Sequence, residues 1–468
     1  MSTLPTIRRT RPFKSRPRLA AIEPEGLRYP LAVRFPSPTQ RLPHPLVVVL
    51  AAGLAARVAV AALTQSWDVP ARRDFLAFGY EMGMIAKALA TGHGFAWPPG
   101  TDWLWYEPGP TAWMPPLYPA LMALVFKGFG LFTPVSAAVL IALQVAASLL
   151  TCALLYVVGR PVFGKGAALL AALALALYPA AIHFSVQKFW STSFFAACPL
   201  LLIPALDGAT RRPTGPVGLA VGLLFGIVAL LDPVVLAAVP FALAWLVWWT
   251  DGKAGARIRV PVAALAGLLV ALSPWMARNH AVFGHLVPVK SNFGNELFVG
   301  NNPFSVGDHR DVGLTLRHWD DLLTPAERAR IEAANEVERN ALLGGKGVRY
   351  VIADPARFLR LSMNRVVHYW TRPNPPGGWA ERISELCWLA VLGLGIVGLA
   401  TSDFRRRRVQ LALLFLLTLP LPFYVTLVAH FRYRFAVEPL LLLFAATAVV
   451  RFRTRFRERR GIPKPRAA

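Results

Sequence analysis

The chain has 468 residues, of which 55% are hydrophobic and only 16% are charged. A water-soluble domain of this size needs a far more polar surface, so this composition excludes the soluble classes of protein. Long apolar segments recur from residue 46 to residue 452, which predicts an all-α protein that crosses the membrane many times.

The net charge of +25 is concentrated outside the apolar segments. A nucleic-acid-binding protein would carry its basic residues on one face of a folded soluble domain, so no nucleic-acid partner is expected. Under the positive-inside rule, both basic ends belong in the cytoplasm. We therefore expect a disordered N-terminal segment at 1–45, a transmembrane domain at 46–452 and a basic cytoplasmic tail at 453–468.

Ten apolar segments are predicted to be full membrane spans, and an eleventh is treated differently. Prolines and glycines interrupt residues 116–133, and the basic connections all fall on the cytoplasmic side only if this segment does not fully cross. We predict a re-entrant or surface helix there, with eleven or twelve spans as the alternative. The ten predicted spans are 46–63, 135–159, 166–183, 190–206, 215–231, 233–250, 258–276, 385–401, 409–429 and 436–452.

Two long loops, at 64–134 and 277–384, then lie outside the cytoplasm, together with the turns at 184–190, Asp232 and 430–435. Polar and aromatic residues without an evident packing role fall in these segments. The cytoplasmic turns hold mainly Arg, Lys, Gly and Pro. This asymmetry predicts that the functional residues lie on the non-cytoplasmic side of the membrane.

The second long loop has helical signals of its own. Thr324, Pro325 and Glu327 match the start of a capped helix. Gly344 and Gly345 are predicted to break that helix. A second, amphipathic helix is expected to start after Asp354 and to rest on the membrane surface.

The first loop contains "RRDFLAFGYEMGMIAKALATGHGF", residues 72–95, which we interpret as an amphipathic helix. Asp74 and Glu81 are seven residues apart and so share one face of it, at the margin of the apolar stripe. They could be solvated acids paired with neighbouring basic side chains. Alternatively, one of them is a general base beside a lipid head group. Asp74 would suit a helix start, whereas Glu81 is predicted to lie in mid-helix, so Glu81 is favoured as the base.

Cationic side chains at the outer membrane edge are candidates for holding phosphate. Arg278 follows the span at 258–276, and Arg432 and Arg434 open the last span in "HFRYRF". The guanidinium group suits phosphate, although Arg278 could also be an interfacial anchor. The other predicted substrate-binding residues are Tyr80, His93, Lys188, Asn279, His430 and Tyr433, with Lys290, Asn292 and Asn295 as further polar candidates.

The sequence lacks a nucleotide-binding loop and a paired metal-binding motif. The cysteines, Cys152, Cys198 and Cys387, lie in apolar segments and are expected to be packing residues. No cofactor and no metal ligands are therefore predicted, although a divalent metal stays open. If the chain is an enzyme, its energy must come from an already activated, lipid-borne substrate.

Four motifs in order, "YEMGMIAKALATGHGF", "PTAWMPPLYPALMALVFKGFG", "RNHAVFGHLVPVKSNFGNELFVGNNP" and "RYRFAVEPLL", carry a resemblance. Together they resemble the GT-C superfamily of membrane glycosyltransferases, especially the bacterial branch similar to protein O-mannosyltransferases and lipid A aminoarabinose transferases. The resemblance implies that the first external loop supplies the catalytic acid, which would be Asp74 or Glu81. It also implies a polyprenyl-phosphate sugar donor bound at the outer membrane edge.

The predicted function is inverting sugar transfer to a lipid, glycan or protein acceptor, at the periplasmic or extracellular face of a bacterial plasma (inner) membrane. A loop carboxylate accepts the acceptor's proton, and cations hold the departing phosphate. A transporter or lipid flippase is the alternative, but the sequence shows no convincing repeat and few buried ionisable residues beyond Arg57 and Asp232. A non-catalytic scaffold would leave the polar outer motifs unexplained.

Overall fold

The computed structural model describes residues 43–68, 80–99, 108–371, 379–427 and 432–460. The chain divides into a unit at 1–34, which lies outside these residues, and a unit at 35–468. Two predicted site residues, Asp74 and His430, also lie outside the described residues.

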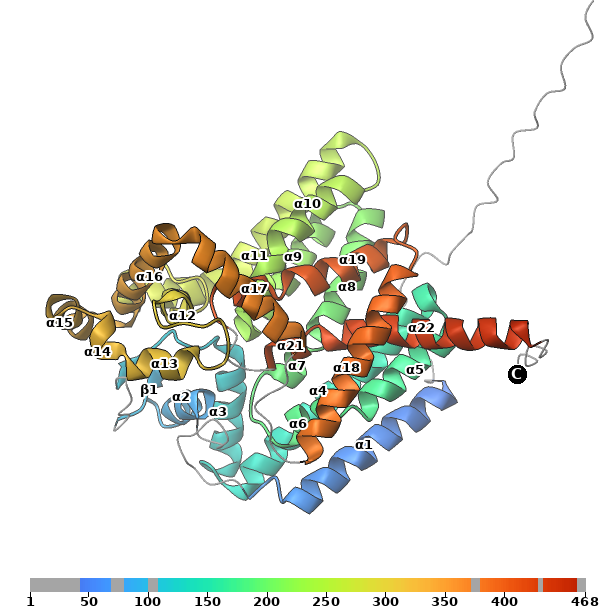
Figure 1. The fold of residues 1–468 in the computed structure, drawn as a ribbon, viewed down its shortest axis with the longest axis horizontal. Coiled ribbons are helices and arrows are strands. Elements are labelled where there is room, and N and C mark those ends of the chain that lie inside the picture. The colour runs from blue at the N-terminus through green and yellow to red at the C-terminus, as the bar shows by residue number, and fades with distance from the viewer. Residues whose placement is uncertain (1–42, 69–79, 100–107, 372–378, 428–431, 461–468) are drawn as a thin grey trace, which may run out of the picture. The chain divides into compact units, whose positions relative to one another are not determined.

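The described part of the chain is almost entirely helical (Figure 1). The elements of its first half are α1 His44–Thr64, α2 Glu81–Ala90, β1 Ala96–Trp97, β2 Gly109–Pro110, α3 Leu117–Phe129, α4 Pro134–Phe163, α5 Lys165–Ala176, α6 Pro179–Val186, α7 Thr192–Phe195, α8 Cys198–Arg211, α9 Gly215–Leu231, η1 Pro233–Ala238 (a 3-10 helix), α10 Val239–Trp249 and α11 Ala254–Phe283. Those of its second half are α12 Phe293–Asn301, α13 Asp311–Arg317, α14 Trp319–Leu322, α15 Pro325–Ala333, α16 Glu336–Ala353, α17 Pro355–Thr371, α18 Trp379–Ala400, α19 Arg407–Thr418, α20 Leu421–Val425, α21 Arg432–Phe435 and α22 Glu438–Arg459. The two strands pair antiparallel, with Ala96 opposite Pro110 and Trp97 opposite Gly109.

Each predicted span coincides with a helix or with a broken pair of helices. Six helices are long and apolar enough to cross a membrane, or seven if the bent pair α5 and α6 is one span. The chain is therefore a multi-pass membrane protein, while ten full spans stay a prediction. Helix α9 and the stretch from η1 to α10 are shorter, and α22 carries arginines throughout its second half.

Helix α3 lies in the segment 116–133, which was predicted not to cross the membrane fully. Its 13 residues give a length of roughly 20 Å, against about 30 Å for the apolar core of a bilayer. Met122, Val125 and Phe126 are buried on one side of α3, in a cluster with Ile85 of α2. A short helix with such contacts fits the predicted re-entrant or surface element.

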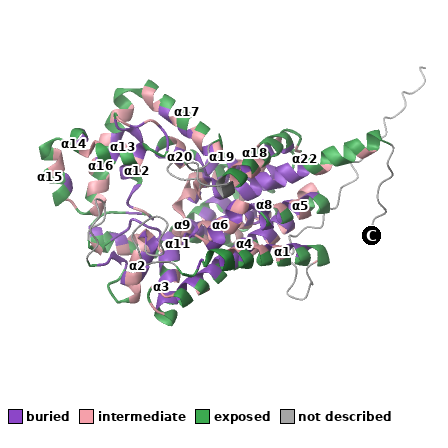
Figure 2. Ribbon diagram, turned by 60° about the horizontal axis from the view of Figure 1, so that its bottom comes forward, coloured by how far each residue is buried: buried purple, intermediate pink, exposed green. Residues whose placement is uncertain are grey.

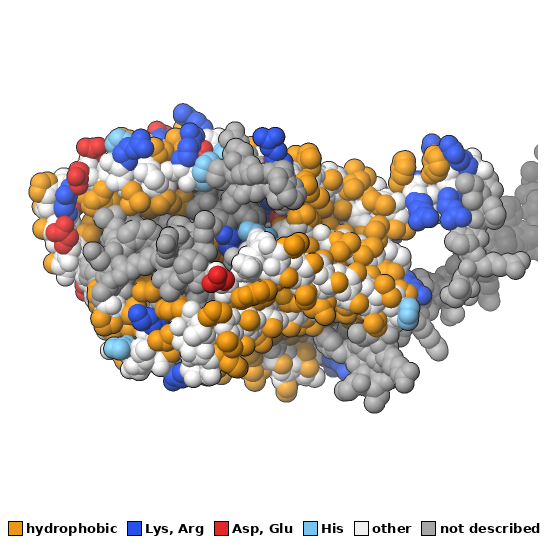
Figure 3. Space-filling model, turned by 90° about the horizontal axis from the view of Figure 1, so that it is seen from below, with side chains coloured by type: hydrophobic (Ala, Val, Ile, Leu, Met, Phe, Trp, Pro, Cys, Tyr) orange, Lys and Arg blue, Asp and Glu red, His pale blue; other side chains and the backbone are white. Residues whose placement is uncertain are grey.

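Hydrophobic and charged side chains occupy different parts of the molecular surface, as expected for a membrane protein (Figure 3). Figure 3 shows hydrophobic side chains over the middle of the visible face, with charged ones gathered over two ends. We call residues 80–99, 108–116 and 284–371 the loop end, and residues 451–459 of α22 the arginine end. Figure 2 shows the first half of α22 buried among other helices, whereas its arginine end is exposed.

The loop end confirms two predicted helix starts and corrects one predicted helix break. Thr324 caps α15 in a reciprocal arrangement with Glu327, and α17 starts at Pro355, as predicted. The predicted break at Gly344 and Gly345 is wrong, because α16 continues through both residues. A Cβ atom on Gly344 would lie 2.8 Å from the Cα atom of Gly294 in α12. The glycine therefore permits a close helix crossing and does not end a helix.

Helix α2 requires a second correction. Within the described residues it begins at Glu81, with Tyr80 as the extended residue before it, so Glu81 is not in mid-helix. Glu81 occupies the first turn, where the helix dipole accommodates a negative charge. The argument that distinguished Glu81 from a helix-start acid therefore no longer holds.

Candidate active site

A cavity of about 450 Å³ opens where the loop end meets the helices. This volume lies within the range of sites that bind small molecules. Its polar lining residues are Ser191, Thr192, Asp232, Lys290, Asn292, Glu296, Thr426, Arg432 and Tyr433, and its apolar ones include Met82, Met114, Trp190, Phe195, Phe293 and Phe423. Segments that are far apart in the sequence thus contribute to one site.

Arg432 opens α21 and is held in place by aromatic side chains. Its guanidinium carbon lies 4.4 Å from the ring centroid of Trp190 and 5.0 Å from that of Tyr433. One of its Nη atoms donates to the Tyr433 hydroxyl at 3.2 Å. Tyr433 in turn stacks on Phe423, with 4.3 Å between the ring centroids. These contacts fix a planar cation at the cavity wall, as recognition of a phosphate group requires.

One wall of the cavity comes from the end of the α11–α12 connection and the first half of α12. It contributes Lys290, Asn292 and Glu296. The Asn292 amide donates to a Glu296 carboxylate oxygen at 3.2 Å. Burial raises the pKa of Glu296, and the Glu81 charge adds to this increase, while Lys290 and Arg432 oppose it. Two carboxyl groups and two cations therefore influence one another across this site.

Glu81 lies next to the cavity residue Met82, at the start of α2. The Trp113 indole nitrogen donates to one of its carboxylate oxygens at 3.2 Å. Burial acts to lower the pKa of Arg432, but Tyr433, Glu81 and Asp232 together raise it above its usual value. The structure thus brings the predicted acid Glu81 into electrostatic contact with the predicted phosphate ligand Arg432.

Arg278 and Asn279 hold the loops together and are not among the described cavity-lining residues. Arg278 donates to the backbone oxygens of Thr111 at 2.7 Å and Phe95 at 2.6 Å. The Asn279 side chain donates to the backbone oxygen of Val287 at 3.0 Å. The phosphate role of Arg278 stays a prediction, and the geometry adds a positioning role.

Glu336 of α16 completes this connection between the two long loops. Its carboxylate accepts hydrogen bonds from the Thr111 hydroxyl, the Ala112 backbone nitrogen and the Ser291 hydroxyl. Ser291 is the neighbour of Lys290 in the cavity wall. We call Thr111, Arg278, Ser291 and Glu336 the loop clasp, because they set the distance between the loops around the cavity.

The other predicted residues lie away from the described lining. Arg434 is buried, donating to Glu438 at 2.7 Å and to the backbone oxygen of Tyr369 at 3.1 Å. Lys188 is buried, 5.7 Å from the centroid of the Trp190 ring. His93 is exposed in the turn after α2, and Tyr80 is buried before it. Lys188 and the cavity residue Arg432 both contact the ring of Trp190.

Glu296 is the ionisable cavity residue that the sequence interpretation missed, and Asp232 was considered only as a buried ionisable residue. Asp232 accepts a hydrogen bond from the Val234 nitrogen and so caps η1, which gives it an ordinary structural role as well. For Glu296 the sequence carried one signal, its spacing of four from Asn292 on α12.

The architecture of the chain is similar to that of solved oligosaccharyltransferase structures. The chain is similar to the oligosaccharyltransferase of Archaeoglobus fulgidus in its apo form, with a TM-score of 0.56 and 15% identity over 90% of this chain and 52% of that one. The same enzyme tethered to an acceptor peptide matches with a TM-score of 0.54 and 14% identity, over 90% of this chain and 50% of that one. The chain thus spans about half the length of the archaeal enzyme. The similarity shows that this chain and the archaeal enzyme share a fold over about 90% of this chain.

Part of the chain also matches a known protein family. Residues 114–277 match the family of dolichyl-phosphate-mannose-protein mannosyltransferases. ArnT from Cupriavidus metallidurans, bound to undecaprenyl phosphate, matches with 15% identity over 87% of this chain and 78% of that one, but its TM-score of 0.37 is too low to establish a shared fold. No curated protein matches the chain.

Proposed function

We propose that this protein transfers a sugar from a polyprenyl-phosphate donor to an acceptor, and that the cavity is its active site. The observation that carries the proposal is that Glu296, Lys290 and Arg432 line one cavity of about 450 Å³, while the charge of Glu81 acts to raise the pKa of both Glu296 and Arg432. A carboxylate beside fixed cations supplies the two functions that such a transfer needs, a proton acceptor and a stabiliser of the leaving phosphate.

The two cations have complementary geometry for the donor phosphate. Arg432 offers a rigid, planar set of donors supported by Trp190 and Tyr433. Lys290 offers a compact charge on a flexible side chain. As the bond from the sugar to the phosphate breaks, negative charge grows on the phosphate, and both groups stabilise it.

A carboxylate on the acceptor side completes a single displacement. The acceptor oxygen attacks the anomeric carbon while the carboxylate takes its proton, and the polyprenyl phosphate leaves with the electron pair of the broken bond. The configuration at the anomeric carbon is then inverted. Glu81 is our preferred base, and Asp74, which lies outside the described residues, is the alternative from the same loop.

Glu296 is a further candidate for proton transfer. Because burial raises its pKa, its carboxylate is a stronger base when ionised, and its neutral form can donate a hydrogen bond to the sugar. Its hydrogen bond from Asn292 directs the side chain from α12. The variants described below separate the contributions of Glu81 and Glu296.

Apolar side chains around the cavity support a lipid-borne donor. Phe293 lines the cavity and is 57% exposed, and Leu421 and Val425 of the neighbouring α20 are also exposed. An exposed apolar edge next to a polar cavity suits a ligand with a hydrocarbon tail and a charged head group. A soluble nucleotide sugar would not use this edge.

The test is turnover by the purified chain in detergent with a panel of polyprenyl-phosphate sugars. We expect release or transfer of at least one sugar, with loss of turnover in Glu81→Gln and Arg432→Ala. Glu332→Gln removes an exposed loop-end carboxylate and should keep wild-type turnover. Equal turnover by all these variants, or none by the wild type with any donor, would contradict the proposal.

A further inference from the structure

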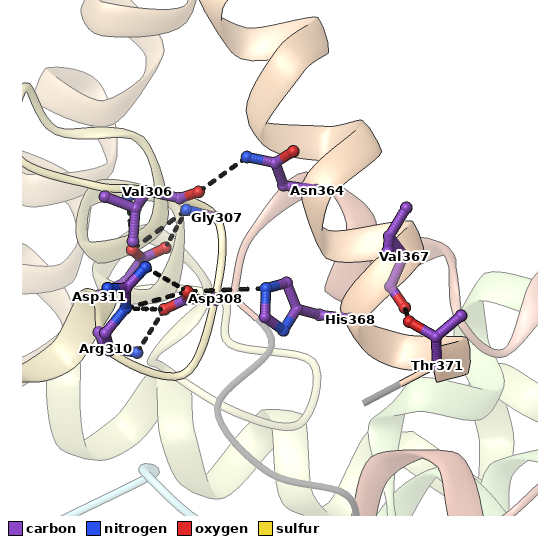
Figure 4. Close-up of polar contacts among 9 residues, drawn as sticks. All are labelled: Val306, Gly307, Asp308, Arg310, Asp311, Asn364, Val367, His368 and Thr371. Carbon is purple, nitrogen blue, oxygen red and sulfur yellow. Dashed lines mark hydrogen bonds and ion pairs between the residues drawn. The ribbon is translucent and has the colours of Figure 1, made fainter. Parts of the chain in front are cut away.

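A second group of polar side chains lies at the loop end, between the loop before α13 and helix α17. It consists of Asp308, His309 and His368, whose potential ligand atoms all lie within 4.8 Å of one another. Figure 4 shows Asp308 and His368 pointing toward each other across this contact. We propose that these three residues form a binding site for a divalent transition-metal ion such as Zn²⁺.

The ligand types and their spacing fit zinc. Two imidazoles and one carboxylate form a typical set of zinc ligands, with a fourth position for water. Metal–ligand bonds of about 2.0–2.2 Å in a tetrahedral site place neighbouring ligand atoms roughly 3.4 Å apart. The His368 Nε2 and Asp308 Oδ2 atoms are already separated by 3.6 Å. His309 is exposed, so its ring is free of the core packing that would oppose a small rotation toward the other two.

The loop that presents Asp308 and His309 is held in place by contacts that need no metal. Asp311 accepts hydrogen bonds from the backbone nitrogens of Val306 at 2.7 Å and Gly307 at 3.2 Å. Asn364 of α17 donates to the backbone oxygen of Val306 at 3.0 Å. The protein therefore organises this site before any ion binds.

Gly307 shows how closely this loop approaches α17. Its φ of +82° lies in the left-handed region, and a Cβ atom there would be 2.7 Å from the backbone oxygen of Leu361. Both the conformation and the space favour glycine. This close approach places the next residue, Asp308, beside His368, which lies about two turns after Leu361 along α17.

Arg310 is the strongest competitor for the carboxylate. It donates to Asp308 through Nε at 3.0 Å and through Nη2 at 2.8 Å. Its backbone nitrogen also donates to Oδ1 at 2.8 Å, and its Nε to both carboxylate oxygens. A carboxylate has about four acceptor positions, so a metal on Oδ2 requires the Arg310 side chain to give up its bonds to that oxygen. The Arg310 side chain is 61% exposed and can move outward if a cation binds. The alternative is that Asp308 only pairs with Arg310 and His368, and the experiment below distinguishes the two.

A metal here would fix α17 close to the cavity. The neighbouring Tyr369 donates from its hydroxyl to the backbone oxygen of Tyr433 at 3.1 Å. Arg365, one turn earlier, donates to the backbone oxygens of Tyr424 and Val425, both at 3.2 Å. The site is therefore structural in character, tying the outer loop to the helix that supports the cavity wall.

The test is zinc binding by the full-length chain in detergent after treatment with a chelator. Calorimetric titration with Zn²⁺ should give one site per chain, and zinc should raise the melting temperature of the wild type. His309→Ala and His368→Ala should each weaken binding at least about tenfold, since even residues behind the ligands change metal affinity 10–100-fold. His285→Ala, at an exposed loop-end histidine outside the cluster, should bind zinc like the wild type.

Two results would overturn the site. One is the absence of stoichiometric zinc binding by the wild type, and the other is wild-type affinity in both His309→Ala and His368→Ala. Because His309 is exposed, its alanine variant should remain folded, which size-exclusion chromatography can verify. Loss of zinc binding by a folded His309→Ala chain therefore reports on the ligand itself. Sugar transfer is not needed for this readout, so the site and the proposed function can fail separately.

Discussion

Replacing Arg432 with alanine should weaken donor binding more than any other single change in the cavity wall. Arg432 is the cation whose geometry is best fixed, between the Trp190 and Tyr433 rings. A hydrogen bond to a charged group contributes about 1.5–3 kcal/mol. Since 1.4 kcal/mol corresponds to a factor of ten, loss of one such bond to the phosphate should weaken donor binding by roughly 10- to 150-fold.

The variant Arg432→Lys separates the contribution of the positive charge to donor affinity from that of the planar guanidinium group. Lysine keeps the positive charge but loses the planar group that stacks on Trp190, so its donor affinity should fall between those of the wild type and Arg432→Ala. Equilibrium binding of a radiolabelled polyprenyl-phosphate sugar to the purified protein measures the difference. Arg349→Ala removes an arginine with a largely exposed side chain at the loop end and is the matched control.

The reasoning is refuted if Arg432→Ala binds the donor as tightly as Arg349→Ala and the wild type. A loss of affinity in Arg432→Ala that is matched by Arg349→Ala would indicate only a general effect of positive charge near the membrane. The salt dependence of binding checks this, because screened surface charges lose their effect at high ionic strength. The Arg432 contact, partly buried in the cavity wall, should persist.

Three further predictions concern chemistry, assembly and acid stability. Glu81→Gln should lower kcat by about 10²–10⁴-fold with little change in donor affinity. Comparable kcat values for wild type and Glu81→Gln would exclude Glu81 as the base. Glu296→Gln should mainly shift the pH profile of turnover. Glu336→Ala should lower the melting temperature, because the Thr111 and Ser291 hydroxyls and the Ala112 nitrogen lose their acceptor; an unchanged melting curve would show that the clasp contributes nothing. A hydrogen bond from Lys346 is the main reason why the pKa of Glu327 falls to about 2. The stability from this pair is therefore fully present above the unfolded pKa of about 4.3 and is lost as the pH falls through 2, so Glu327→Gln should flatten the stability profile over that interval.

The sequence predicted the helices well because apolar segments of sufficient length carry their own signal. Every predicted span coincides with helix, and the capping residues Thr324 and Glu327 marked the start of α15. Gly344 was misjudged because its role depends on Gly294, 50 positions earlier in the chain, which the local sequence does not reveal. Glu81 was misplaced because Tyr80 is not one of the polar residues that usually announce a helix start.

The site was predicted in part, for a related reason. Glu81, Arg432 and Tyr433 stood out as polar or charged residues at a membrane edge. In the structure Arg432 and Tyr433 line the cavity, and Glu81 precedes the lining residue Met82. Arg278 had the same signal but donates to backbone oxygens of the first loop. Residue type and membrane depth can be inferred from sequence, whereas the direction of a side chain depends on tertiary contacts.

The cavity assignment is tested most directly by photo-cross-linking a polyprenyl-phosphate sugar that carries a photoreactive group beside the phosphate. Purified wild-type protein would be irradiated with this probe, digested and mapped by mass spectrometry, with and without excess unlabelled donor. We predict that the cross-links fall within 190–195, 288–296 and 422–437, and that the unlabelled donor abolishes them. Cross-links that concentrate at the arginine end, or that persist unchanged in excess donor, would contradict the assignment of this cavity as the site of sugar transfer.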